Sequence, residues 1–257
     1  MLEREQRIAE EAARAAGEII RGYYDGKIEV REKSRDNPVT EADLRANECI
    51  HARIREAFPD DGWLSEETRD SRERLDRRRV WIVDPLDGTK EFIQHIPELC
   101  VCIALVEDGE PTVGVSYNPI TKDMFSAARG SGMQCNGKPG RVSEVSELKS
   151  ARVLASRSED KRGEWDEFKP KMQVVLTGSV AYKLALIASG RGDATFSLTP
   201  KNEWDICSGA ALILEAGGRI TDRDGKPLVF NREKTLLPGI IATNGALFDT
   251  VRSLIHG

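Results

Sequence analysis

Residues 80–92 read Val-Trp-Ile-Val-Asp-Pro-Leu-Asp-Gly-Thr-Lys-Glu-Phe, and the rest of the chain is organised around this stretch. Its first four residues are β-branched or aromatic and predict a buried strand. Because Pro85 has no N–H for a sheet ladder, we expect the chain to leave the sheet near that residue. Asp84 and Asp87 then lie at the end of the strand, and Gly88 allows a close backbone approach there.

Two carboxylates this close repel each other unless a positive charge lies between them. A hard divalent cation fits best, because Mg²⁺ takes oxygen ligands and often binds through one or two carboxylates plus a substrate phosphate. The alternative is an Asx-type turn, which the sequence Asp-Pro-x-Asp-Gly also favours. The stretch alone therefore favours a metal site only modestly, and carboxylates elsewhere in the chain must decide.

The composition of the 257 residues is that of an ordinary soluble protein, with 39% hydrophobic and 32% charged residues. A net charge of -5 and the lack of a long Lys/Arg cluster argue against a nucleic-acid polymer as partner. The longest apolar run, residues 99–106, is too short to cross a membrane, and the N-terminus lacks the apolar segment of a secretory signal. Five cysteines without a CxxC pair suit a reducing compartment, so we predict a cytoplasmic protein.

The hydrophobic pattern divides the chain into two halves, residues 1–147 and 148–257. The first half is predicted to be α+β with an antiparallel sheet and the metal-binding motifs, and the second to be α/β and to complete the site. For the first half we expect helices at 3–24 and 40–58, strands at 27–33, 99–106, 111–117 and 123–128, a polar loop at 34–38, and a charged, solvated linker at 68–79. For the second half we expect strands at 153–156, 173–176, 193–198, 219–221 and 239–243, and helices at 179–189, 205–216 and 246–255.

Further acids lie at the edges of predicted elements: Asp43, Glu66, Glu67 and Asp205. Asp43 lies three residues before Ala46 on the predicted buried side of its helix, where its alternative role is to complement the helix dipole. Asp205 lies at a predicted helix start, where an aspartate is ordinarily an N-cap. Taken together, these acids supply the oxygen ligands that two or three Mg²⁺ ions would need.

Three ordered motifs carry a resemblance to a known family: Leu-Ser-Glu-Glu at 64–67, Asp-Pro-Leu-Asp-Gly-Thr at 84–89, and Trp-Asp at 204–205 followed by Glu-Ala-Gly-Gly at 215–218. Over nearly its whole length the chain resembles the inositol monophosphatase superfamily of Mg²⁺-dependent, lithium-sensitive phosphatases. The resemblance implies the layered αβαβα sandwich of the sugar phosphatases, which include inositol monophosphatase and fructose bisphosphatase. It also implies an active site between the two halves.

The resemblance also implies roles for individual residues. Mg²⁺, as two or three ions, would be held by Glu66, Asp84, the Leu86 carbonyl, Asp87 and Asp205. Asp43 and Thr89 correspond to the pair that orients and deprotonates the attacking water, and Glu67 is counted with them as catalytic. The residues implied to contact substrate are Glu66, Leu86, Asp87, Gly88, Thr89, Gly178, Ser179, Lys183 and Asp205. Lys33 falls where the family tends to place a basic residue.

Within the superfamily, Lys90-Glu91-Phe92 together with Leu-Ser-Glu-Glu resembles the 3'(2'),5'-bisphosphate nucleotidase (CysQ) branch. The implied reaction releases AMP and phosphate from adenosine 3',5'-bisphosphate, a small phosphorylated substrate. The chain departs from this branch at 178–183, where it has Gly-Ser-Val-Ala-Tyr-Lys in place of the common Gly-Ser-Ser-Leu-Lys.

Several alternatives stay open at this point. Within the superfamily they are inositol-1-monophosphatase and fructose-1,6-bisphosphatase activity, and outside enzymes a metal- or nucleotide-binding module without turnover. A haloacid-dehalogenase-type phosphatase would need Asp-x-Asp-Gly-Thr, and here the first acid is one residue too far away. A homodimer is also left open.

Overall fold

The strand predicted at residue 80 lies second in a seven-stranded sheet in the computed structural model, which describes residues 2–26, 28–34 and 37–256. The strand order is β3-β4-β5-β6-β7-β8-β9, and only β3 and β4 are parallel. These strands are β3 (Gly62–Ser65), β4 (Arg79–Asp87), β5 (Cys100–Glu107), β6 (Glu110–Asn118), β7 (Asp123–Ala128), β8 (Gly132–Cys135) and β9 (Lys138–Gly140). The antiparallel sheet predicted for the first half is thus present.

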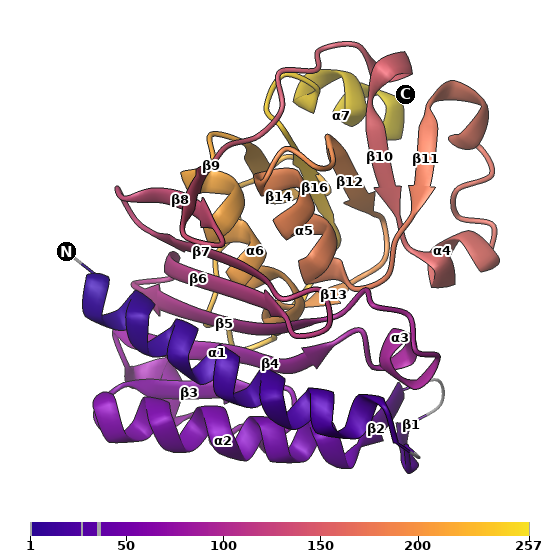
Figure 1. Cartoon of the computed structure of the whole chain (residues 1–257). Helices are drawn as coiled ribbons and strands as arrows, with labels where there is room; N and C mark the ends of the chain where they lie inside the picture. Colours follow the sequence, from indigo (N-terminus) through magenta and orange to yellow (C-terminus); the bar gives the residue numbers. More distant parts are fainter. Residues whose placement is uncertain (1, 27, 35–36, 257) are drawn as a thin grey trace.

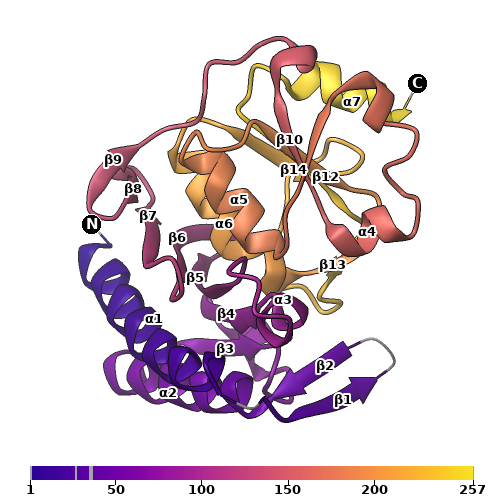
Figure 2. The same cartoon turned by 45° about the vertical axis from the view of Figure 1, so that its right-hand side comes forward.

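A second, five-stranded sheet has the mixed order β11-β10-β12-β16-β14. Its strands are β10 (Arg152–Ala155), β11 (Gln173–Leu176), β12 (Ala194–Ser197), β14 (Arg219–Asp222) and β16 (Ile240–Thr243). Two small antiparallel pairs complete the sheets: β1 (Val30–Ser34) with β2 (Asn37–Thr40), and β13 (Lys201–Asn202) with β15 (Leu236–Leu237). In Figure 2 the β1–β2 pair projects beside one end of α2.

The helices form three layers around the two sheets, which confirms the αβαβα sandwich (Figure 1). One face of the large sheet carries α1 (Glu3–Tyr24) and α2 (Glu41–Ala57). Between the sheets lie α5 (Val180–Ala188) and α6 (Glu203–Glu215), and α7 (Phe248–His256) covers the far face of the small sheet. Two short helices, α3 (Thr89–Ile93) and α4 (Arg157–Lys161), follow β4 and β10.

Strand β4 shows why the middle of the molecule is so apolar. Trp81 and Val83 belong to the core beneath α1 and α2, whereas Val80 and Ile82 belong to the core shared with α5 and α6. Because successive side chains of a strand point to opposite faces, a strand covered on both faces needs a continuous apolar run rather than an alternating one. Gly114 lets α6 approach the sheet, since a Cβ there would lie 2.4 Å from the Ser208 carbonyl oxygen.

The sequence predicted that the chain leaves the sheet near Pro85, and this prediction is wrong. The strand continues to Asp87 through a β-bulge, because Asp84 pairs with Cys102 and Asp87 with Cys100, so three steps on β4 match two on β5. The bulge accommodates the proline, which has no N–H to give to the ladder.

Three other predictions need correction. Residues 34, 37 and 38 of the predicted polar loop belong to the strands β1 and β2, and residues 35–36 lie outside the described residues. Lys27, the first residue of the strand predicted at 27–33, also lies outside them. The linker at 68–79 is not wholly solvated, because Arg74, in the 3-10 turn Glu73–Asp76, is 2% exposed. The helix predicted to start at Asp205 begins at Glu203, with Asn202 as its N-cap.

Candidate active site

A cleft of about 330 Å³ opens where the end of β4 meets α3 and the first turns of α5 and α6. Sixteen residues line it: Pro38, Glu66, Asp84, Leu86, Asp87, Gly88, Thr89, Lys90, Glu91, Ser156, Ser158, Ser179, Val180, Lys183, Asn202 and Asp205. Most of the residues predicted as metal or substrate contacts from the sequence lie in this set.

Three carboxylates converge at the base of the cleft. Asp84, Asp87 and Asp205 each offer an oxygen, and the three oxygens lie within 4.8 Å of one another. In a regular strand, residues three apart point to opposite faces. The extra residue of the β4 bulge therefore lets Asp84 and Asp87 reach the same site, where α6 adds Asp205.

Each of these carboxylates is fixed by hydrogen bonds on its outer side. Leu86 N–H donates to Asp84 at 2.9 Å, the Ser179 hydroxyl and Ala181 N–H donate to Asp87 at 2.5 and 2.7 Å, and Asn202 N–H donates to Asp205 at 3.1 Å. The bond from Asn202 is part of a capping box, so Asp205 does help to cap α6, although as its third residue and not as its N-cap. The capping role leaves its second oxygen for the cleft.

The electrostatics of the triad favour a bound cation. Burial raises the pKa of Asp84 well above its ordinary value, and the charges of Glu66, Asp87 and Asp205 raise it further. Burial and the neighbouring acids likewise raise the pKa values of Asp205 and Asp87. Buried oxygen donors that repel one another suit a hard divalent ion such as Mg²⁺, so the residues present fit the predicted metal.

Glu66 and Glu67 occupy different positions relative to the cleft. Glu66 lines the cleft, outside the triad, and its carboxylate lies 2.6 Å from Lys33 Nζ. Glu67 accepts a second bond from Lys33 at 2.7 Å, and its side chain is 4% exposed and is not part of the cleft lining. The catalytic role given to Glu67 stays a prediction.

Asp43 and Thr89, which the resemblance implies are a water-activating pair, are hydrogen-bonded to each other. Asp43 Oδ2 accepts bonds from the Thr40 N–H (2.8 Å) and hydroxyl (2.6 Å), while Oδ1 lies 3.0 Å from the Thr89 hydroxyl. The Thr89 oxygen is also 3.1 Å from the Leu86 carbonyl oxygen. Burial raises the pKa of Asp43, against the lowering effect of its hydrogen bonds from Thr40 and Thr89.

The backbone conformation at the N-cap of α3 requires a glycine at position 88. Its φ is 102°, and a Cβ there would lie 2.9 Å from the Glu98 carbonyl oxygen. Only glycine adopts this conformation without strain, so the turn that presents Thr89 depends on it.

The predicted substrate contacts on α5 fall into two groups. Ser179 and Lys183 line the cleft, and Lys183 is 4% exposed, with a pKa that burial lowers. Gly178 is not in the lining, and its N–H donates to the Glu98 carboxylate at 2.6 Å. Tyr182 is buried and packs edge-on against Phe125.

The sequence reasoning missed several residues of the lining: Pro38, Lys90, Glu91, Ser156, Ser158, Val180 and Asn202. Ser156 and Ser158 follow the carboxyl end of β10. Ligands of α/β sheets bind outside the carboxyl ends of the strands, so polar residues at such a position are a usable signal of a binding site. Asn202 could have been found as the N-cap partner of Asp205, three residues before it.

Comparison with known proteins agrees with this fold. The sequence model described as "Inositol monophosphatase family" matches residues 1–255. Inositol monophosphatase 3 of Solanum lycopersicum is 36% identical over 255 residues, covering 94% of this chain and 92% of the relative. The 3'(2'),5'-bisphosphate nucleotidase CysQ of Salmonella typhimurium is 37% identical over 237 residues, covering 90% and 96%. The structure of inositol monophosphatase from Anabaena sp. PCC 7120 superposes with a TM-score of 0.84 at 32% identity, covering 99% and 96% of the two chains.

The layered fold with its acidic cleft thus defines a phosphatase of a class that is in general Mg²⁺-dependent. Within that class, the chain belongs to the inositol monophosphatase family. Relatives with different printed activities are similar to it to nearly the same degree, so identity alone does not select a substrate.

Proposed function

We propose that the chain is a Mg²⁺-dependent phosphomonoesterase that hydrolyses the 3'-phosphate of adenosine 3',5'-bisphosphate to AMP and phosphate. The observation that carries the phosphatase assignment is the convergence of three mutually repelling carboxylates beside the Thr89–Asp43 pair in one cleft. Phosphoryl transfer needs positioning and charge stabilisation more than covalent chemistry, and this arrangement provides both.

Glu66, Asp84, the Leu86 carbonyl, Asp87 and Asp205 would hold the metal, as two or three ions. When bound, Mg²⁺ would supply Lewis-acid charge that acidifies water and neutralises the leaving oxygen. The Thr89 oxygen accepts a hydrogen bond from the attacking water and passes its own proton toward Asp43 Oδ1. Water attacks phosphorus, and the bond from phosphorus to the 3' oxygen breaks. That oxygen takes up one proton from solvent water, and Asp43 releases the proton that it received to solvent, so the protons balance.

Gly88 and Thr89 would hold the remaining phosphate oxygens through backbone N–H groups, while Ser179, whose hydroxyl donates to Asp87, would contact substrate through its backbone. The backbone turns at Gly88 (φ 102°) before α3, so the N–H groups that follow lie at the start of a helix, where anions are bound favourably. Gly178 and Glu67 would act from the layer behind the cleft, through Glu98 and Lys33 respectively.

Lys183 supports a substrate with a second anionic group. Its ammonium is buried in the cleft wall and, within the described part of the chain, is not ion-paired. Burying this cation is costly, and the charges of Glu159, Asp87 and Glu91 offset the cost only from beyond ion-pair distance, so a second phosphate would complete the site. This favours adenosine 3',5'-bisphosphate, and also fructose 1,6-bisphosphate, over inositol 1-phosphate.

Inositol-1-monophosphatase activity is the second candidate, because a relative of that name is 36% identical over most of the chain. Fructose-1,6-bisphosphatase activity and a binding module without turnover are the remaining alternatives. A cytoplasmic location and a homodimer stay predictions. Among the described residues, no helix is both long and apolar enough to cross a membrane.

The test is to compare kcat/KM for the three substrates with and without Mg²⁺. We expect adenosine 3',5'-bisphosphate to be preferred, and Lys183→Met to raise its KM by ~10-fold or more while leaving inositol 1-phosphate within ~2-fold. Asp87→Asn should lower kcat by at least ~10³-fold for every substrate, whereas the exposed Asp60→Asn should change nothing. A preference for inositol 1-phosphate that Lys183→Met does not alter would reject the bisphosphate assignment, and turnover without Mg²⁺ would reject the mechanism.

A further inference from the structure

A second hollow lies at the outer edge of the large sheet, where the edge strand β3 runs beside α2 (Figure 1), and it shares no lining residue with the cleft. It has a volume of about 220 Å³. We call it the arginine groove, because four arginines and two aromatic rings line it: Arg55, Arg69, Arg74, Arg77, His51 and Trp63. No residue of the proposed metal site takes part in it.

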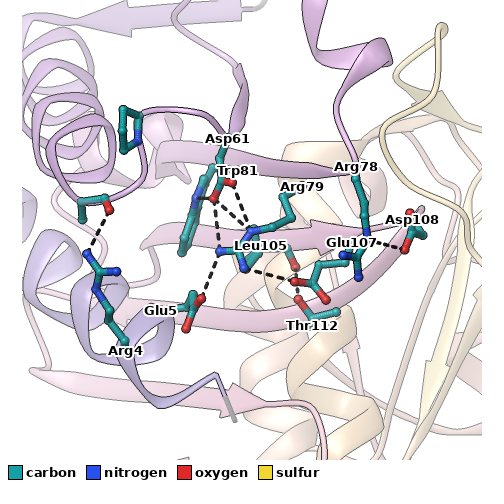
Figure 3. Close-up of polar contacts among 12 residues, drawn as sticks. Arg4, Glu5, Asp61, Arg78, Arg79, Trp81, Leu105, Glu107, Asp108 and Thr112 are labelled. Atoms are coloured by element: carbon teal, nitrogen blue, oxygen red, sulfur yellow. Dashed lines mark hydrogen bonds and ion pairs between the residues drawn. The ribbon is translucent and has the colours of Figure 1, made fainter.

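Two of the charged side chains that line the groove are paired with groups outside it. Asp61 turns its carboxylate to Arg79, at 3.1 Å, and to the Trp81 N–H, at 2.9 Å (Figure 3). Arg74 is 2% exposed and donates twice to Asp70, at 3.0 and 2.8 Å. The charge of Arg74 is therefore compensated, and that of Asp61 is partly offset by Arg79, which also pairs with Glu5 and Glu107.

The remaining charges leave the groove positive. Among the described residues, Arg55 donates to the carbonyl oxygens of Pro59 and Asp61, at 2.8 and 3.0 Å, and to no carboxylate, which fixes the side chain but leaves its charge uncompensated. Arg69 and Arg77 form no ion pair with any residue that the structure describes. Besides Asp61, the described lining contains one acid, Glu73, so the cations outnumber the acids in the groove.

An aromatic wall adjoins the arginines. The Trp63 ring is partly exposed, lies edge to face with His51 at 4.7 Å between centroids, and has its N–H 3.4 Å from the Thr68 hydroxyl. Burial and the Arg55 charge lower the pKa of His51, so its ring is neutral at pH 7 and presents an apolar surface. A positive patch beside a fixed aromatic face is the combination that binds phosphorylated aromatic molecules.

We propose that the arginine groove binds a nucleoside phosphate, with its phosphates at Arg69 and Arg77 and its base against Trp63. Guanidinium groups match phosphate oxygens in geometry and form charge-assisted hydrogen bonds with them. This second site is independent of the reaction proposed for the cleft, and a failure of that reaction would leave it unaffected.

The experiment is a calorimetric titration of the whole chain with ATP in EDTA, where no cation links the nucleotide to the acidic cleft. Adenosine and tripolyphosphate serve as probes of the two halves of the ligand. The test variant is Arg69→Ala with Arg77→Ala. The matched control is Arg72→Ala with Arg78→Ala, which removes the same charge from the same segment, but at arginines outside the groove that pair with Glu233 and Asp108.

We expect ATP to bind the wild-type chain more tightly than either probe. The groove variant should lose ~10-fold or more in affinity, because two charge-assisted contacts are removed, and the control should stay within ~2-fold. Circular dichroism and Tm establish that both variants are folded. Absence of ATP binding, or an equal loss in the control, would overturn the proposal, and tripolyphosphate binding as tightly as ATP would overturn the nucleoside part of it.

Discussion

The Thr89 hydroxyl lies between two oxygens, Asp43 Oδ1 at 3.0 Å and the Leu86 carbonyl at 3.1 Å. A hydroxyl has a single hydrogen and can donate to only one of them at a time. Donation to the carboxylate leaves the Thr89 oxygen free to accept a bond from water in the cleft. The proposed proton transfer depends on this choice of partner.

Thr89→Ala should therefore slow the chemistry and leave metal binding unchanged. We expect kcat to fall by about 10²–10⁴-fold, the usual contribution of a positioned acid–base group, while Mg²⁺ affinity measured by calorimetry stays within ~2-fold. Thr89→Ser keeps the hydroxyl and should retain most of the activity. A loss of Mg²⁺ affinity in Thr89→Ala as large as its loss of kcat would contradict the role.

The sequence could place Asp43 but could not choose between its two interpretations. Its spacing from Ala46 put it on the buried side of α2, as either a functional acid or a complement to the helix dipole. In the structure one oxygen accepts capping bonds at the start of α2 and the other lies 3.0 Å from the Thr89 hydroxyl, so the two contacts are compatible, and the catalytic role stays a prediction. A pattern along one helix carries no information on a partner 46 residues away, which is why the second contact needed the family resemblance.

At the scale of elements, a polar cluster ties α1 and the loop after α2 to β4 and β5. Arg79 on β4 donates to Asp61 at 3.1 Å, to Glu5 of α1 at 3.1 Å and to Glu107 of β5 at 3.3 Å, and Asp61 also accepts the Trp81 N–H (Figure 3). The three acid side chains are 10–13% exposed and Arg79 is 27% exposed. One guanidinium thus holds three acids together at the edge of the core.

Arg79→Met should destabilise the fold by about 2–3 kcal/mol, because it leaves three shielded acids without their shared cation. For a chain of this size that corresponds to a fall in Tm of about 5–10 °C, measured by thermal unfolding. Arg78→Met is the matched control: its ion pair with Asp108 is 70% and 67% exposed, so the change should be below ~0.5 kcal/mol. Equal Tm values for the two variants would mean that the cluster contributes no more than an exposed pair.

The β-bulge in β4 shows what local sequence patterns cannot predict. The apolar run was read correctly as a buried strand, but the predicted exit from the sheet near Pro85 is wrong, because a strand can accommodate a proline either by ending or by forming a bulge. Which of the two occurs depends on β5, where Cys102 and Cys100 pair with Asp84 and Asp87. That information lies on another strand, so the bulge that aligns the two acids could not be predicted locally.

At the scale of the whole molecule, the sequence indicated most helices and strands, whereas their stacking in five layers followed from the family resemblance. Hydrophobic periodicity shows which face of a helix is buried, but not against which sheet. Helix α6 illustrates this, since it is apolar nearly all round and packs against β4, β5 and β6 of the large sheet and against α5 and β14. The division into halves at residues 147 and 148 stays a prediction.

The acidic triad also has a consequence for the stability of the whole chain. Burial, and then the charges of Glu66, Asp87 and Asp205, raise the pKa of Asp84 in the folded state. A carboxyl whose pKa is raised by folding destabilises the fold increasingly as pH rises from its unfolded pKa of about 3.9 to the raised folded value, and by a constant amount above that. Without a bound cation, the site thus lowers the free energy of unfolding at neutral and higher pH.

Asp84→Asn should therefore raise Tm in EDTA at about pH 8, and its advantage over the wild type should shrink toward about pH 4. Asparagine keeps the oxygen that accepts the Leu86 N–H bond but carries no charge. Each unit of raised pKa corresponds to about 1.4 kcal/mol, and one kcal/mol moves Tm by about 2–4 °C at this size, so we expect a gain of at least ~3 °C. Excess Mg²⁺ should reverse the order, because ligand binding stabilises the wild type more than a variant that has lost a ligand charge. Asp60→Asn, at an exposed position, should show neither effect. If the wild type in EDTA is as stable as Asp84→Asn from about pH 4 to about pH 8, the three carboxylates do not repel one another as the structure indicates, and the argument for a cation between them fails.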